Sequence, residues 1–378
     1  MKKHLVLVGG GHAHLATLLH LAEYTKKGHR VTLISPGRYH FYSGMGPGML
    51  SGLYEPRQVR FHIAKMATDR GAAFIEDTVT RIDPHNRILF LAGGRDIGYD
   101  VASFNVGSDV PMTGIGVPQE EIIPVKPIVN LFHARGSILK KIRGRALNLV
   151  VIGGGPAGVE ISGNLWRLVH VGGGATRITL LAGQQLLKDF PSRVRRLALS
   201  SLTSRNIKVM EGMRAHAVGK GSIACSDGSS LPYDYAFIAA GVRPSPLFRE
   251  SGIPPGEDGA GLLVNRYLQS VAYPELFGGG DCISLGGHRL AKVGVYAVRQ
   301  NPVLRHNLMA ALEGGELKSF DPGGSTMLIM NMGNDRGILC KSGWVWDGRL
   351  VFALKDFIDK RFMKKFQVSG ETAEPTAD

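Results

Sequence analysis

Short runs of apolar, β-branched residues alternate along the chain with longer amphipathic stretches. The apolar runs at 5–8, 30–35, 149–152 and 177–182 are four to six residues long, which is the usual length of a strand buried in a sheet. Strands that alternate with helices form parallel sheets covered by helices. The pattern therefore predicts an α/β fold.

One arrangement of elements occurs twice, about 140 residues apart. Each copy has a glycine-rich turn after a strand, then a second strand, and then a Tyr-Asp segment that leads to a glycine. The first copy reads VGGGHAHL (8–15), RVTLIS (30–35) and YDVASFNVGS (99–108), and the second reads IGGGPAGVE (152–160), RITLLA (177–182) and YDYAFIAAGVRP (233–244). The repeat predicts two Rossmann-like units that each bind a dinucleotide.

The segment after the second copy is predicted to return to the first unit, because it adds LFGGGDCI (276–283) and a helical stretch at 293–312. We expect a discontinuous first unit (1–118 and 250–322), an inserted second unit (119–249) and a C-terminal segment (323–378). Turn-forming residues at 111–118 and 254–261 mark the linkers. The last ten residues, 369–378, are expected to be disordered.

The first glycine turn has two unusual residues. Gly9 and Gly11 follow a strand and precede a helix, where glycine lets the backbone approach a pyrophosphate at the helix N-terminus. His14 stands where a third glycine is usual, and Ser35 replaces the acidic residue expected at the end of the second strand. A hydroxyl binds a ribose more weakly than a carboxylate, and a plain α/β turn without a ligand is the alternative.

The second glycine turn is complete. Gly153, Gly155 and Gly158 satisfy the GxGxxG pattern, and Glu160 follows on the first turn of the helix. The second strand again ends without an acid for a ribose 2′-hydroxyl. Three arginines about ten residues further on could meet a 2′-phosphate or form a solvated helix face: Arg193, Arg195 and Arg196. The choice between NADH and NADPH therefore stays open.

Composition narrows the class of protein. The formal net charge of +14 suits nucleic acid, an anionic membrane or anionic cofactors, but the chain has no nucleic-acid module, so we expect no nucleic acid as a partner. Cys225, Cys282 and Cys340 form no CxxC or CxxxxC pair, so we expect neither disulfides nor a metal site. No apolar run approaches the ~20 residues of a membrane-spanning helix, and the N-terminus lacks a signal-like segment, so we expect a cytoplasmic protein.

The two glycine motifs, the two Tyr-Asp segments and the late Gly280-Asp281 together resemble the pyridine nucleotide-disulfide oxidoreductases, flavoproteins with two dinucleotide sites. VTLISPGRYHFYSGMGPGML (31–50), PVKP (124–127), GVYAVRQ (294–300) and LKDFIDKRFM (354–363) are similar to the NADH dehydrogenase-like branch. That branch includes the flavoprotein fused to selenide, water dikinase and is close to type II NADH dehydrogenases. The resemblance implies an enzyme that passes a hydride from NADH or NADPH to FAD, and electrons from FAD to a quinone or another small acceptor.

The resemblance also assigns roles to single residues. It implies that FAD is held by Gly9, Gly11, His14, Ser35, Gly107, Ser108 and Asp281, and that NAD(P)H is held by Gly153, Gly155, Gly158 and Gly241. Glu160 would lie beside the nicotinamide and Lys126 close to the flavin edge, and these two are the candidate catalytic residues. Tyr296 and Gln300 would lie on the acceptor side.

The acceptor distinguishes the branches of the superfamily. Disulfide reductases carry a CxxxxC pair where this chain reads YSGMGPGM (42–49), so dithiol chemistry is excluded. Sulfide:quinone oxidoreductases need two cysteines near the flavin, of which Cys340 could supply only one. Type II NADH dehydrogenases use several glutamines at the quinone site, and here only Gln300 matches, because Val295 and Arg299 occupy the other positions. A redox sensor or partner module linked to selenium metabolism and a reductase of a ferredoxin-like protein stay open as alternatives.

The C-terminal segment carries an amphipathic pattern. Apolar residues recur at every fourth position with Phe357 beside them: Leu350, Leu354, Ile358, Phe362 and Phe366. Lysines flank this stripe, namely Lys355, Lys360, Lys364 and Lys365, and Trp344 and Trp346 precede it. Such a helix can lie in a membrane interface, or it can pack onto the FAD unit or onto a second subunit of a homodimer. Residues 344–366 are therefore a candidate for peripheral contact with the inner face of the cytoplasmic membrane.

Overall fold

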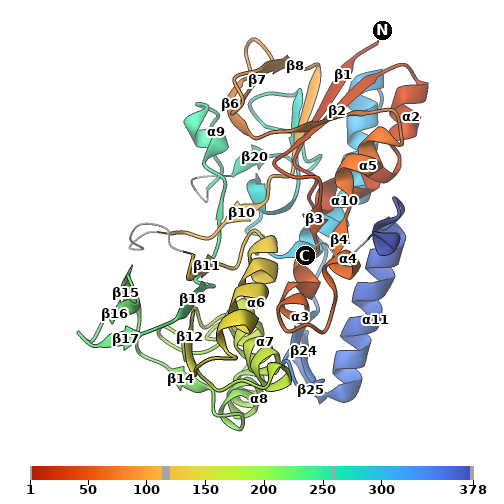
Figure 1. The fold of residues 1–378 in the computed structure, drawn as a ribbon. Coiled ribbons are helices and arrows are strands. Elements are labelled where there is room, and N and C mark those ends of the chain that lie inside the picture. The colour runs from red at the N-terminus through yellow and green to blue at the C-terminus, as the bar shows by residue number, and fades with distance from the viewer. Residues whose placement is uncertain (1, 113–119, 258, 260, 375–378) are drawn as a thin grey trace.

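Two parallel sheets lie one above the other in the molecule (Figure 1). The computed structural model describes residues 2–112, 120–257, 259 and 261–374. The first sheet has the order β21-β9-β1-β2-β5, from Leu276–Gly278, Val101–Phe104, His4–Val8, Arg30–Ser35 and Ala73–Glu76. The second has the order β11-β18-β12-β13-β14, from Ile122–Pro124, Tyr235–Ile238, Leu147–Ile152, Thr176–Leu181 and Lys208–Met210.

The sequence repeat corresponds to a structural repeat. In the first sheet β1 lies between β9 and β2, and in the second β12 lies between β18 and β13 in the same parallel arrangement. All five residues of β1 and five of the six in β12 are buried, which is why these strands read as continuous apolar runs. The α/β class with two Rossmann-like units is confirmed.

Helices follow the strands in both units. In the first unit they are η1 (His12–His14), α1 (Leu15–Leu19), α2 (Leu21–Lys26), α5 (Ile63–Thr68) and the long α10 (Gly294–Glu313). In the second they are α6 (Val129–Lys141), α7 (Pro156–Gly172) and α8 (Ser192–Thr203). The start of α7 directly after β12 places the second glycine turn at the carboxyl end of the sheet, where parallel sheets bind their ligands.

Smaller elements complete the two units. The first carries an antiparallel sheet of β6 (Val79–Asp83), β7 (Ile88–Leu91) and β8 (Asp96–Gly98). It also has two strand pairs, β3 (His40–Phe41) with β4 (Arg60–Phe61) and β20 (Leu262–Val264) with β22 (Ile283–Leu285). Its short helices are η2 (Ser43–Met45), α3 (Gly46–Leu50), α4 (Pro56–Val59) and η3 (Gly280–Cys282). The second carries β15 (Ala215–Gly219), β16 (Ser222–Cys225) and β17 (Ser230–Pro232). β10 (Ser108–Asp109) pairs with β19 (Arg243–Pro244).

The chain returns to the first sheet after the second unit, as predicted, because β21 pairs with β9. The return begins slightly earlier than residue 250. Helix α9 (Leu247–Glu250) packs against β6, and the Phe248 ring lies 5.2 Å from that of Phe104. Most of the linker expected at 111–118, with the boundary after 118, lies outside the described residues, as do residues 258 and 260 of the second linker.

A three-stranded antiparallel sheet and a long helix form the C-terminal segment. The strands are β23 (Leu328–Asn331), β24 (Gly337–Lys341) and β25 (Trp344–Gly348), and helix α11 (Arg349–Phe366) runs along one side of the molecule (Figure 1). The segment contacts both units, because β23 packs against α7 and α11 packs against β4. Within the described residues no helix is long and apolar enough to cross a membrane.

The apolar stripe predicted on this helix does not form one face. Leu350, Leu354 and Ile358 are exposed, whereas Phe362 and Phe366 pack on the ring of Phe61. A step of four residues advances about 40° around an α-helix, so the stripe crosses to the opposite side within four steps. The inner face is instead formed by Val351, Lys355, Asp359, Met363 and Phe366.

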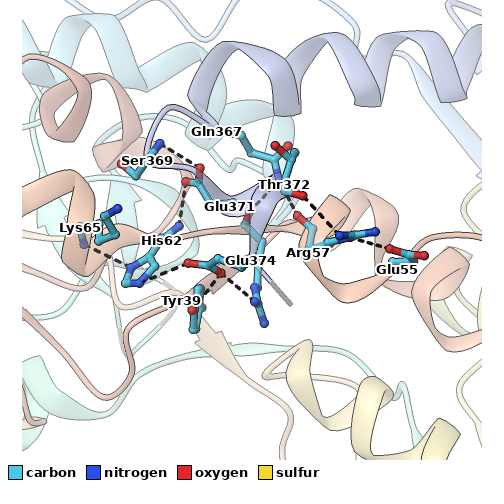
Figure 2. A network of polar contacts seen from close by, with 11 residues as sticks. Tyr39, Glu55, Arg57, His62, Lys65, Gln367, Ser369, Glu371, Thr372 and Glu374 are labelled. Carbon is cyan, nitrogen blue, oxygen red and sulfur yellow. Dashed lines mark hydrogen bonds and ion pairs between the residues drawn. The ribbon is translucent and has the colours of Figure 1, made fainter. Parts of the chain in front are cut away.

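The expectation of a disordered tail is wrong for residues 369–374. The carboxylate of Glu371, which has no exposed surface, accepts hydrogen bonds from the backbone N–H groups of His62 (3.0 Å) and Ser369 (2.9 Å). Glu374 accepts from Arg60 (2.8 Å) and from the Tyr39 hydroxyl (3.0 Å) (Figure 2). The composition of the tail is that of a solvated segment, but its carboxylates accept hydrogen bonds from three residues of the first unit, His62, Arg60 and Tyr39. Residues 375–378 lie outside the described residues.

Candidate active site

The first glycine turn is held by a side chain that sequence reasoning missed. Asn105 follows β9 and accepts a hydrogen bond from Ala13 N (2.9 Å), while its amide donates to Gly279 O (2.6 Å). Gly9 has φ +82°, and a Cβ there would approach Asn105 O to 2.5 Å. Asn105 thereby joins the turn to the Gly-Asp segment. Its only sequence signal is its position one residue past an apolar strand.

His14 is completely buried and its ring nitrogens contact protein groups. Nδ1 lies 2.6 Å from Gly9 O and Nε2 lies 2.8 Å from the Ser103 hydroxyl. Burial lowers its pKa to about 4, so the ring is neutral at physiological pH. His14, at the position of the usual third glycine, therefore links the glycine turn to strand β9 through both ring nitrogens. Neither nitrogen is left to bind a cofactor.

Lys126, Ser108 and Asp281 meet although they come from three distant segments. The Lys126 ammonium lies 2.7 Å from Asp281 Oδ2 and donates to the Ser108 hydroxyl (2.9 Å), which itself donates to Asp281 (2.8 Å). Gly107 precedes Ser108 with φ +76°, and a Cβ there would meet no atom within 4 Å. The three side chains predicted near the flavin thus form one charged cluster beside an open stretch of backbone.

The two residues predicted on the acceptor side, Gln300 and Tyr296, differ in burial. Gln300 is 1% exposed, and its side-chain carbonyl accepts from Gly280 N (2.6 Å), so it fixes the Gly-Asp turn. Tyr296 is half-buried one helical turn before it, with the Arg299 guanidinium 5.9 Å from its ring centre. Ser35 is buried at the end of β2, and its predicted contact with a ribose stays a prediction.

His12 is a second residue that sequence reasoning missed. Its ring is 8% exposed and lies 4.7 Å from the His40 ring and 5.3 Å from the Tyr42 ring, and Nδ1 is 3.1 Å from His40 Nε2. Burial and the charge of Lys126 lower its pKa to about 4. Its buried Nε2 has no hydrogen-bond partner among the described residues. A buried nitrogen without a partner, beside a glycine turn at a helix start, is typical of a site that a ligand completes.

In the second glycine turn, two glycines are required because a side chain would collide with the backbone, and a third has free space beside it. A Cβ on Gly153 or Gly158 would collide with the carbonyl oxygens of Ala239 and Gly153, respectively. A Cβ on Gly155 would meet nothing within 4 Å, and no side chain caps helix α7, which begins there. Gly241 is also open, with φ +82°. The turn therefore leaves backbone and a helix N-terminus accessible to an anionic group.

The three arginines considered for a 2′-phosphate do not border this turn. A pocket next to it is lined by residues of the turn, by the end of β13 and by Lys188, Asp189 and Arg214. Arg195 instead pairs with Glu211 (2.6 Å), and Arg193 and Arg196 are exposed on α8. The interpretation of those arginines as a solvated helix face fits the structure.

Glu160 joins the second unit to the C-terminal segment. It lies just after the first turn of α7, rather than on that turn as the sequence predicts, and its Oε1 accepts from the backbone N–H of Asn331 in β23 (2.7 Å). Loss of solvent raises the pKa of Glu160 to about 7, while Lys355 and the Asn331 N–H act in the opposite direction. Glu160 can therefore change its protonation state near neutral pH.

Lys355 is buried, contrary to its expected place on a solvated flank. Its ammonium lies 2.7 Å from Asp359 Oδ2 and donates to Gly44 O (2.7 Å). Asp359 also accepts from the Tyr42 hydroxyl (3.0 Å). Helix α11 thus adds a buried ion pair to the region between Glu160 and the ring of His12.

Residues 3–306 match the sequence profile of the pyridine nucleotide-disulphide oxidoreductases. The chain belongs to this family. Members of the family are FAD-dependent oxidoreductases that use NAD(P)H, so the enzyme class and the two cofactors expected from the sequence are confirmed at this level.

Known members resemble the chain over different lengths. Ferroptosis suppressor protein 1 of Taeniopygia guttata is 25% identical over 312 residues, covering 80% of each chain. The internal alternative NAD(P)H-ubiquinone oxidoreductase A1 of Solanum tuberosum is 31% identical over 185 residues, covering 45% of this chain and 37% of the relative. The structure of NDH2 from Plasmodium falciparum in complex with NADH superimposes with a TM-score of 0.81 and 15% identity over the whole of both chains.

The residues present fit both cofactors of the family. Gly155 and the uncapped start of α7 would hold the diphosphate of NAD(P)H, and Gly9, Gly11 and the Lys126 cluster would hold FAD. The unpartnered Nε2 of His12 is consistent with a polar ligand at the first turn. The individual roles of these residues stay predictions.

Proposed function

We propose that the protein oxidises NADH or NADPH and reduces a quinone at a membrane surface. In the overall reaction a hydride from NAD(P)H and one proton from solvent convert quinone to quinol and leave NAD(P)⁺. When bound, FAD would supply the hydride-accepting and electron-donating chemistry, and the protein would supply placement and charge. Relatives whose names include NAD(P)H and ubiquinone support the proposal.

Helix α11 is the observation that carries the quinone assignment. Its inner face brings Lys355 and Asp359 to the region of Glu160, and its outer face is apolar. Six of the eleven exposed large apolar side chains in the described chain lie within residues 344–358: Trp344, Trp346, Leu350, Leu354, Phe357 and Ile358. We call these six side chains the apolar patch.

The apolar patch has the composition of a lipid-binding surface. Two tryptophans lie at one end, and the exposed Arg361, Lys364 and Lys365 follow at the other end of the helix. Apolar side chains flanked by basic residues bind an anionic bilayer by burial and by charge. A quinone dissolves in the bilayer, so the patch would bring the site to its acceptor at the cytoplasmic face of the membrane.

Two side chains would act on protons and charge. Glu160, with a pKa of about 7, can hold or release a proton next to the nucleotide turn. Lys126, held by Asp281 and Ser108, places a positive charge where it would stabilise negative charge on a reduced cofactor.

Cys282 is unsuited to a sulfide:quinone reaction. Cys282 is completely buried, and its thiol donates to the carbonyl oxygens of Phe104 (3.4 Å) and Gly279 (3.3 Å). Burial raises the pKa of Cys282 to about 11, so the nucleophilic thiolate is scarce at neutral pH.

The test separates electron transfer from membrane binding. The FAD-loaded full chain is mixed with NADH or NADPH without oxygen, and bleaching of the flavin followed by recovery with a short-chain quinone is expected. Leu350→Ser combined with Phe357→Ser should keep this reaction but weaken co-sedimentation with anionic vesicles about tenfold or more. Val171→Ser with Val271→Ser, two exposed valines outside the patch, is the matched control.

Two results would refute the proposal. A flavin that neither nucleotide bleaches would exclude the dehydrogenase reaction and favour a redox module without turnover. Recovery of the oxidised flavin with a ferredoxin-like protein but not with quinone, together with no vesicle binding, would make the acceptor a protein.

A further inference from the structure

A pocket of about 220 Å³ lies at the carboxyl end of β13, beside the second glycine turn. Its lining includes Gly154 and Gly155 from the turn, Gln184 from the strand end, and the charged residues Lys188, Asp189 and Arg214. In a dinucleotide-binding unit the adenosine ribose lies at this strand end, where an acid binds a 2′-hydroxyl and an arginine accommodates a 2′-phosphate. The charged residues of this pocket therefore decide which nucleotide is preferred.

Backbone hydrogen bonds hold both basic residues at this pocket. Leu187 N donates to Gly154 O (2.7 Å), which fixes the loop against the glycine turn immediately before Lys188. On the other side Met213 forms a β-bridge with Gly183, and Gly212 N donates to Gln184 O (3.2 Å). Arg214 follows directly, so its position at the end of β13 is set by the sheet.

The charge balance of the pocket favours an anion. The side chains of Lys188 and Arg214 form no ion pair or hydrogen bond with any described residue. Glu211, which lies just before this bridge, is already occupied by Arg195 (2.6 Å) and by Leu186 N (2.8 Å). Asp189 is the one acid in the described lining, and it opposes two cations.

We infer that Lys188 and Arg214 form a subsite for the 2′-phosphate of the adenosine, so that the protein prefers NADPH to NADH. The inference rests on the proposed function, because it concerns the same nucleotide site. A phosphate dianion between an arginine fork and a lysine gains charge-assisted hydrogen bonds that a 2′-hydroxyl lacks. The glutamines at the strand end, Gln184 and Gln185, add no charge that would repel it.

The competing assignment uses Asp189. If its carboxylate binds the 2′-hydroxyl, it repels a 2′-phosphate and the preference is reversed. The two assignments predict opposite orders of affinity for two small nucleotides, 2′,5′-ADP and 5′-AMP, which share the adenosine and differ only in the 2′-phosphate.

Calorimetric titration of the FAD-loaded full chain with these two nucleotides tests the subsite without turnover. At low salt 2′,5′-ADP should bind about tenfold tighter than 5′-AMP, and the difference should shrink as salt is added. Arg214→Ala and Lys188→Ala should each remove a large part of the preference and leave 5′-AMP binding unchanged. Arg193→Ala with Arg196→Ala, two exposed arginines on α8 outside the pocket, should behave as the wild type.

The outcomes distinguish failure of the 2′-phosphate subsite from failure of the proposed function. Three results would each overturn the subsite. The first is binding of 5′-AMP that is equal to or tighter than that of 2′,5′-ADP, and the second is a preference that survives in the combined Lys188→Ala and Arg214→Ala variant. The third is loss of 5′-AMP binding in Asp189→Asn. In each of these cases bleaching of the flavin by NADH would leave the proposed function intact. If neither small nucleotide binds and neither NADH nor NADPH bleaches the flavin, the subsite and the proposed function both fail.

Discussion

Replacement of Glu160 by glutamine should remove a titration that destabilises the folded protein as the pH rises. The pKa of Glu160 is raised from 4.5 to about 7, chiefly by loss of solvent. A group whose pKa rises on folding binds its proton more tightly in the folded state. Its stabilising contribution is therefore complete below pH 4.5 and is lost as the pH rises through 7.

The size of the effect follows from the pKa shift. At about 1.4 kcal/mol per pKa unit the full loss is about 3 kcal/mol, and partial exposure of the side chain reduces it to about 2 kcal/mol. An unfolding entropy near 2.1 cal/mol/K per residue gives about 0.8 kcal/mol/K for 378 residues. The wild type should thus lose about 3 °C in Tm relative to Glu160→Gln between about pH 5 and about pH 8.

Thermal unfolding of the FAD-loaded protein across this pH range is the assay. Glutamine keeps a side-chain oxygen that can accept the hydrogen bond from Asn331 N, so the comparison isolates the charge. Glu250→Gln changes an exposed glutamate on α9 and should follow the wild-type curve. If the wild type and Glu160→Gln give parallel curves across the range, the Glu160 pKa is not raised and the argument from desolvation is refuted.

Three further predictions concern residues whose hydrogen-bond partners or close backbone contacts are defined in the structure. Asn105→Leu leaves Ala13 N and Gly279 O without their partner, so we expect a loss of about 2–4 kcal/mol and weaker retention of FAD in gel filtration; equal FAD retention would contradict this. Gly155→Val should weaken NAD(P)H binding with little change in Tm, whereas Gly158→Val should prevent folding. A Cβ at position 158 would collide with the backbone oxygen of Gly153, but a Cβ at position 155 would meet no atom within 4 Å. Glu371→Ala strips two backbone N–H groups of their acceptor and should speed protease cleavage within residues 369–374, while the exposed Glu316→Ala should not.

The glycine turns and the parallel sheets could be predicted because their signals are local. A strand, a glycine cluster and a helix follow each other within some twenty residues, and the strand order then brings Ser108, Lys126 and Asp281 together. Asn105 and His12 carried no such signal. Their partners, Gly279 and His40, lie 174 and 28 residues away, and nothing in the sequence around them specifies those contacts.

Helix α11 shows why its environment could not be predicted from its own sequence. An every-fourth pattern suggests one face, yet the helix rotates the stripe from solvent at Leu350 to the core at Phe366. Lys355 is expected on a solvated flank, yet it is buried, because Asp359 neutralises its charge and Gly44 O accepts a hydrogen bond from its ammonium. Asp359 in turn accepts from the Tyr42 hydroxyl, and both Gly44 and Tyr42 come from elsewhere in the chain. This side of the helix can be buried because each charge of the ion pair has a partner. On the opposite side Leu354 and Phe357 are exposed and are not covered by any described part of the chain. The same geometry therefore accounts for a charged inner face next to Glu160 and an apolar outer face.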